Sequence, residues 1–123
     1  MELKTLFDQV SDSSESTYRI PKGIELIVKN KEQIIKLCQH YQVEEFFVFG
    51  SSLEQHFSAE SDLDFIVNFK KLPFDIYTDY YFGLHEELEK IFHRKVDLIT
   101  VNSLENKFFK EKVFQTRRLL YAS

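Results

Sequence analysis

The sequence has a single cysteine, Cys38, among its 123 residues, so the chain cannot form an internal disulfide. Its start lacks any uninterrupted apolar stretch as long as a signal peptide or a membrane span. No long block of Lys and Arg is present, and acidic residues outnumber basic ones by 20 to 16. The broad basic surface of a nucleic-acid-binding protein is therefore not expected, and duplex DNA is disfavoured as a substrate. These absences predict a cytoplasmic protein without a membrane association.

Aromatic residues, in contrast, are plentiful. Thirteen Phe and six Tyr can bury a large area in a short chain, and the length suits one compact domain with a single core. Residues 8–19 are polar, rich in serine and without periodicity, which is typical of a loop or a flexible arm. We therefore predict a polar N-terminal extension at residues 1–20 and one folded domain at residues 21–123.

The hydrophobic pattern predicts an α/β (α+β) fold, in which helices cover a small mixed β-sheet. Strands are predicted at residues 43–49, 63–69 and 96–101, with a short extended edge at 118–121. Apolar residues at helical spacing predict helices that include residues 34–41, 77–91 and 108–113. Asn30, paired with Gln33, is the predicted cap of the first helix, and Ser103 is the predicted cap of the last.

Two aspartates break the apolar pattern of the second predicted strand. Aspartate is a poor strand residue and is costly to bury, yet Asp62 and Asp64 flank Leu63 in this segment. Because strand side chains alternate, both carboxylates project from one face, roughly 6 to 7 Å apart at their Cα atoms. A divalent cation would relieve their repulsion, and ligation by carboxylates alone indicates Mg²⁺.

A third aspartate, Asp97, lies in the strand Val96-Asp97-Leu98-Ile99. If this strand neighbours that of Asp62 and Asp64, the three carboxylates form one face that can hold one or two Mg²⁺ ions for phosphoryl transfer. The alternative is a solvated edge strand whose polar face points outward.

The first predicted strand ends at Gly50-Ser51, before a short helical segment. A turn of this kind presents free backbone N–H groups to an anion. Gly50 permits close approach of a phosphate, and the Ser51 hydroxyl can donate a hydrogen bond to it. Glycine and serine are also common in ordinary turns, so this motif alone is weak.

In combination, Gly50-Ser51, ten intervening residues and Asp62-Leu63-Asp64 resemble the signature of the nucleotidyltransferase superfamily that includes DNA polymerase beta. The resemblance implies that Gly50 and Ser51 bind the nucleotide phosphates. It also implies that Asp62 and Asp64 ligate Mg²⁺, and that Asp97 completes the catalytic and metal-binding site.

The resemblance extends over roughly residues 24–121 to the MntA-type antitoxin branch, through Tyr41-Gln42-Val43, the Lys-Val-Asp-Leu strand and the closing Leu119-Leu120-Tyr121. It implies a HEPN-domain ribonuclease toxin as partner, in a hetero-oligomer. It further implies that ATP is the substrate and that AMP is transferred to a tyrosine of the toxin.

The chain departs from this branch at Glu54, where an arginine often follows the Gly-Ser pair. A negative charge could weaken nucleotide binding, change the substrate, or mark a protein that neutralises its partner by binding alone. Two alternatives therefore stay open: a nucleotidyltransferase of small molecules such as aminoglycosides, and a catalytically silent antitoxin.

Other polar and aromatic residues are expected to be structural. The histidines lack mutual metal-ligand spacing, so no zinc site is predicted. Tyr77, Tyr80 and Tyr81 lie mostly on the apolar stripe of a helix and are expected in a core or an interface. Basic residues beside strand ends protect edges or contact phosphate: Lys70, Lys71, Arg94 and Lys95.

Overall fold

A computed structural model of the chain describes residues 4–10, 20–104 and 106–123. Within them, four strands form one mixed sheet in the order β3-β2-β1-β4. The strands are β1 (Val43–Phe49), β2 (Leu63–Phe69), β3 (Val96–Thr100) and β4 (Arg118–Ala122). β1 is antiparallel to both β2 and β4, whereas β2 and β3 are parallel. The predicted α/β fold with a small mixed sheet is confirmed.

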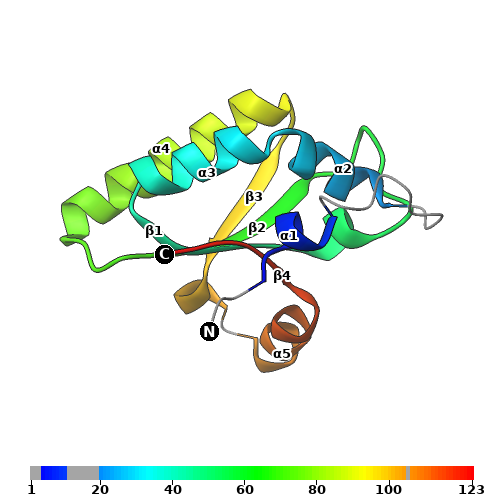
Figure 1. Cartoon of the computed structure of the whole chain (residues 1–123). Coiled ribbons are helices and arrows are strands. Elements are labelled where there is room, and N and C mark those ends of the chain that lie inside the picture. The colour runs from blue at the N-terminus through cyan, green and yellow to red at the C-terminus, as the bar shows by residue number, and fades with distance from the viewer. Residues whose placement is uncertain (1–3, 11–19, 105) are drawn as a thin grey trace.

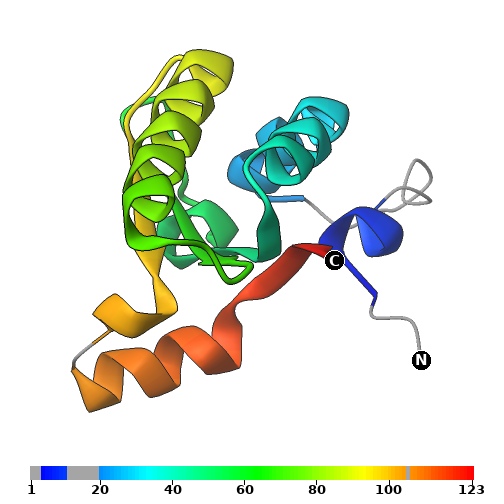
Figure 2. The same cartoon turned by 90° about the vertical axis from the view of Figure 1, so that its left-hand side faces the viewer.

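Five α-helices surround this sheet in the described residues. They are α1 (Leu6–Val10), α2 (Lys22–Lys29), α3 (Lys31–His40), α4 (Phe74–Phe92) and α5 (Lys107–Thr116). Two short 3-10 helices follow strands, η2 (Gly50–Leu53) and η3 (Val101–Ser103). Figures 1 and 2 show α3 and α4 side by side on one face of the sheet and α5 on the opposite face. No described helix has the length and apolar character to cross a membrane.

The alternation of side chains along the strands divides the apolar residues into two clusters. The main cluster lies between the sheet and α3 and α4, and it includes Leu63, Phe65 and Val67 of β2. A smaller cluster, which we call the α5-side cluster, consists of Phe47, Phe49, Ile66 and Val113. Since Asp64 is two residues from Ile66, its side chain projects from the α5 side of the sheet.

Asn30 lies at the predicted N-cap position of α3 but does not cap it with its side chain, and the predicted cap of α5 was wrong. The Asn30 side chain makes no capping bond to α3, and its amide instead donates to the Leu26 carbonyl at 2.9 Å. The reason is an unpredicted helix, α2, which ends directly before α3 and places Asn30 at its C-terminal end. At α5 the cap is Asn106, whose side-chain oxygen accepts from the Phe109 N–H at 3.0 Å, while Ser103 belongs to η3.

The first described helix, α1, lies within the predicted N-terminal extension. Leu6 and Phe7 are only 1% and 2% exposed and belong to the main cluster. Their apolar side chains therefore add to the core of the domain. Residues 11–19, which hold most of the serine-rich stretch, lie outside the described residues, and the domain boundary at residue 21 stays a prediction.

Candidate active site

The turn after β1 is built on Gly50. Phe49 pairs with Asp64 in the antiparallel register of β1 and β2, so the chain leaves β1 directly beside Asp64. Gly50 has a φ of +68°, in the left-handed region that favours glycine. A Cβ atom at this position would lie 2.6 Å from Asp64 Oδ2. Both the backbone conformation and the proximity of the carboxylate therefore require glycine here.

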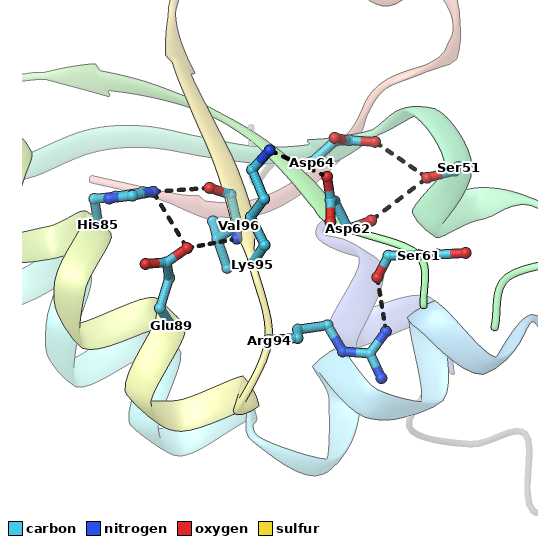
Figure 3. Close-up of polar contacts among 9 residues, drawn as sticks. All are labelled: Ser51, Ser61, Asp62, Asp64, His85, Glu89, Arg94, Lys95 and Val96. Atoms are coloured by element: carbon cyan, nitrogen blue, oxygen red, sulfur yellow. Dashed lines mark hydrogen bonds and ion pairs between the residues drawn. The ribbon is translucent and has the colours of Figure 1, made fainter. Parts of the chain in front are cut away.

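Two serines then bind the turn to β2. Ser51 Oγ lies 3.3 Å from Asp64 Oδ2 and 3.4 Å from the Asp62 carbonyl oxygen, and its hydrogen can be donated to either (Figure 3). Ser52 is fully buried, and its Oγ accepts from the Asp64 N–H at 3.1 Å. The predicted phosphate-binding turn and the predicted metal-binding strand are thus in direct contact.

Asp64 and Asp97 are neighbours across the parallel pair of β2 and β3. Because paired residues of adjacent strands project from the same face, both carboxylates stand on the α5 side of the sheet. Burial raises the pKa of Asp64 to about 6, and the negative charge of Asp97 adds to this effect. Hydrogen bonds from Ser51 act in the opposite direction. Burial is thus the main cause of the raised pKa, and the charge of the neighbouring Asp97 is the second.

Asp62 has a different environment, directly before β2. Its Oδ2 lies 3.8 Å from Lys95 Nζ, and Figure 3 shows the side chain of Lys95, the residue before β3, extending toward it. The two side chains are 37% and 70% exposed, respectively, so the ion pair is weak. The negative charge of Asp62 is therefore partly balanced by Lys95.

A cavity of about 810 Å³ lies against the two paired aspartates. Asp64, Asp97, Gly50 and Glu54 contribute to its wall. Further lining residues come from α4 and α5, and they include Tyr81, His85, Glu89, Phe109, Lys112 and Val113. The volume is within the range of small-molecule and cofactor sites and is sufficient for a nucleotide.

The carboxylates fit Mg²⁺ by their chemistry. Carboxylate oxygens are the ligands that Mg²⁺ prefers, and a cation between Asp64 and Asp97 would compensate both the burial of Asp64 and its repulsion by Asp97, which together raise the Asp64 pKa. In the described part of the chain, however, no three His, Cys, Asp or Glu side chains stand together as a metal-binding group. Since Asp62 is paired with Lys95, it would have to leave this lysine to join the other two aspartates.

Sequence reasoning missed Gly23, which lies in α2. A Cβ atom here would lie 2.3 Å from the Ser52 carbonyl oxygen, so α2 packs backbone against backbone on η2. A glycine inside a helix can mark such a close approach, but this helix was not predicted, so the signal was not available from the sequence. α2 therefore packs directly against η2, the segment that contains Gly50 and Ser51.

The basic residues beside the strands have separate roles. Arg94 Nη1 donates to the carbonyl oxygens of Ser58 and Ser61, at 3.0 and 2.9 Å, and so holds the loop that leads into β2. Lys70 comes directly after β2, whereas Asp64 lies near the start of that strand. Of the four basic residues beside the strands, Lys95 is the one that lines the cavity.

The fold and this arrangement of turn and carboxylates define the class of protein as a nucleotidyltransferase. Residues 32–123 match the model of the family described as "Polymerase beta, Nucleotidyltransferase". The chain belongs to this family, and it is an enzyme of the nucleotidyltransferase class.

Two relatives from Methanocaldococcus jannaschii are named as protein adenylyltransferases. One is 34% identical over 90 residues, which are 73% of this chain and 87% of the relative. The other is 37% identical over 82 residues, which are 65% of this chain and 86% of the relative. The chain therefore aligns with most of the length of both relatives.

Solved structures share the fold at low sequence identity. A toxin-antitoxin complex with AMP-PNP has a TM-score of 0.60 at 22% identity, with 76% of this chain and 74% of that chain covered. A minimal nucleotidyltransferase has a TM-score of 0.57 at 22% identity, with coverage of 76% and 91%. A tri-AMPylated Shewanella oneidensis HEPN toxin in complex with its MNT antitoxin gives 0.54 at 22% identity, with coverage of 77% and 71%.

Proposed function

We propose that this protein is a Mg²⁺-dependent adenylyltransferase that transfers AMP from ATP to a tyrosine hydroxyl of a HEPN-domain ribonuclease toxin, and so acts as its antitoxin. The observation that carries the proposal is the pairing of Asp64 and Asp97 beside the Gly50-Ser51 turn, on the wall of a nucleotide-sized cavity. The names of the two archaeal relatives support protein adenylylation. The fold shared with the toxin-antitoxin complexes agrees with an antitoxin role.

In this proposal the phosphates of ATP lie at the start of η2. The N–H groups of the turn and the Ser51 hydroxyl donate hydrogen bonds to phosphate oxygens. Asp62, Asp64 and Asp97 would hold one or two Mg²⁺ ions, and Ser51 and Lys95 would then give up their contacts with Asp64 and Asp62. When bound, Mg²⁺ would neutralise the triphosphate charge and help the attacking oxygen to ionise.

The reaction joins the tyrosine oxygen of the partner to the α-phosphorus of ATP. As that bond forms, the bond between the α-phosphorus and the bridging oxygen breaks, and pyrophosphate leaves with its electron pair. In this proposal Asp97 accepts the hydroxyl proton or polarises the nucleophile through metal, and its exposure at the cavity wall supports this role. The toxin would therefore bind in a hetero-oligomer with its tyrosine beside Asp97. We expect this reaction to take place in the cytoplasm, where ATP is available.

A catalytically silent antitoxin is the second candidate, and Glu54 favours it. This glutamate lines the cavity where a phosphate-binding arginine is common in the branch that the chain resembles. Its Oε2 lies 2.6 Å from His56 Nε2, so one carboxylate oxygen of Glu54 contacts that histidine. Binding alone would require neither ATP nor the aspartates.

The test combines chemistry with protection of cells. The purified protein is incubated with α-phosphate-labelled ATP, Mg²⁺ and the co-expressed partner, and a panel of aminoglycosides is tested in parallel. We expect label on a partner tyrosine, none on the aminoglycosides, and loss of labelling in Asp62→Asn and Asp64→Asn. Protection of cells by the variant with all three aspartates changed to asparagine would instead favour binding alone, and label on an aminoglycoside would favour the small-molecule alternative.

A further inference from the structure

β3, which carries Asp97, is an edge strand of the described sheet. The Leu63 N–H of β2 donates to the Lys95 carbonyl at 3.2 Å, so the backbone groups of Lys95 and Asp97 face β2. Because these groups alternate along a strand, those of Val96 and Leu98 face the opposite side. That side is the one next to α4.

Three side chains of α4 bind this free edge. The Val96 N–H donates to Glu89 Oε2 at 2.9 Å, and His85 Nε2 lies 2.7 Å from the Val96 carbonyl oxygen (Figure 3). The Tyr81 hydroxyl donates to the Leu98 carbonyl oxygen. Each of these residues follows the previous one by four positions, so the three side chains lie on one face of the helix.

These bonds hold the residues immediately before and after Asp97. The backbone of β3 at Asp97 is thereby fixed by β2 on one side and by α4 on the other. The same three side chains line the cavity that Asp97 faces. A displacement of β3 along or away from β2 would move the Asp97 carboxylate relative to Asp64.

We propose that Tyr81, His85 and Glu89 are positioning residues that set the location of the Asp97 carboxylate against Asp64 through the backbone of β3. This inference rests on the proposed function for its role in catalysis. His85 acts by donating its Nε2 hydrogen to Val96, and Glu89 acts by accepting the Val96 N–H. None of the three is a catalytic residue, because each acts through the strand.

Protection of the edge against association is the competing role. Native proteins block free edges with charges, prolines or bulges, and such devices need no match to one residue of the strand. Here three hydrogen-bonding groups converge on the two residues that flank Asp97. Edge protection predicts effects on solubility and stability alone, whereas positioning predicts effects on metal affinity and turnover.

The variants remove or keep the bonds one at a time. His85→Leu and Glu89→Leu remove the donor and the acceptor, while His85→Gln and Glu89→Gln keep a group of the same kind at similar reach. Tyr81→Phe removes only the hydroxyl. Glu86→Leu is the matched control, because Glu86 is exposed on the same helix and pairs only with Lys90 among the ion pairs of the described residues.

Two readouts separate positioning from protection. The first is Mn²⁺ affinity of the full chain without nucleotide, measured by electron paramagnetic resonance. The second is the split between kcat and KM for ATP in adenylylation of the partner. We expect the leucine variants to lose roughly 10- to 100-fold in Mn²⁺ affinity or kcat, with KM for ATP changed by less than about threefold. The glutamine variants restore most of this loss, and the control variant stays at the level of the unchanged protein.

The inference is overturned if folded leucine variants, checked by circular dichroism, keep full Mn²⁺ affinity and kcat and lose only thermal stability. It is also overturned if the unchanged protein binds no Mn²⁺. Absence of AMP transfer by a protein that does bind Mn²⁺ contradicts the proposed function alone. In that case the Mn²⁺ affinities of the leucine and glutamine variants still decide this inference.

Discussion

Gly50→Ala perturbs the turn and the metal-binding strand at once. Alanine at a φ of +68° costs about 1 to 2 kcal/mol relative to glycine, because its Cβ crowds the carbonyl oxygen that follows. The new Cβ also lies 2.6 Å from Asp64 Oδ2, so the carboxylate must rotate away from Ser51. We expect a drop in Tm on the order of 5 °C and a loss of activity on the order of 100-fold.

The assay pairs thermal unfolding with labelling of the partner by ATP. Gly83→Ala is the matched control, since the three atoms nearest to its Cβ would belong to the Tyr41 side chain, at 2.8 to 3.1 Å, and a side chain can move. In the middle of α4, alanine also gains about 1 kcal/mol of helix propensity. We expect the control to keep its activity. Full activity and unchanged Tm in Gly50→Ala would refute the role given to this glycine.

Three further predictions concern the residues around the paired carboxylates. Ser52→Ala leaves the Asp64 N–H without its partner and is expected to lower the free energy of unfolding by about 1 to 3 kcal/mol in urea titrations; an unchanged midpoint would contradict this. The raised Asp64 pKa means that the folded protein holds this proton more tightly than the unfolded chain does. Stability of the metal-free protein should therefore fall as pH rises from about 4 to about 6, and the fall should be absent in Asp64→Asn. The rise in Tm caused by Mg²⁺ should accordingly be larger at pH 7 than at pH 5, and an equal rise at both would count against the carboxylate as ligand. Lys95→Gln frees Asp62 from an exposed ion pair worth about 1 kcal/mol or less. The affinity of the protein for Mn²⁺ without nucleotide should therefore rise by no more than about fivefold. A decrease in this affinity would contradict the competition between Lys95 and the metal for Asp62.

The strands were predictable because their signals are local. The β1 run of aromatic and β-branched residues ends at a glycine, and the apolar segments of β2 and β3 show the same clear boundaries. The hydrogen bonds of the helix caps were not predictable in this way, because they depend on neighbouring elements. Asn30 does lie directly before α3, but its side chain bonds to α2, a helix that was not predicted. Ser103 belongs to η3, so Asn106 caps α5 in its place.

The site was predictable in its residue types and not in its contacts. The spacing of the aspartates indicates a shared face, but the parallel register that places Asp64 beside Asp97 is a property of the assembled sheet. The same holds for the Lys95 partner of Asp62 and for the close approach of Gly23 to η2. Contacts between segments far apart in the chain leave no periodic trace in the sequence.

The most direct test of the central claim is a crystal structure of the protein with Mg²⁺ and a non-hydrolysable ATP analogue. We predict a Mg²⁺ ion about 2.1 Å from carboxylate oxygens of Asp64 and Asp97, with the phosphates against the backbone of Gly50 and Ser51. A nucleotide bound instead in the second hollow, of about 460 Å³ beside Lys22, Lys29 and Arg94, would contradict it. So would a phosphate group at Gly50 with no metal on either aspartate.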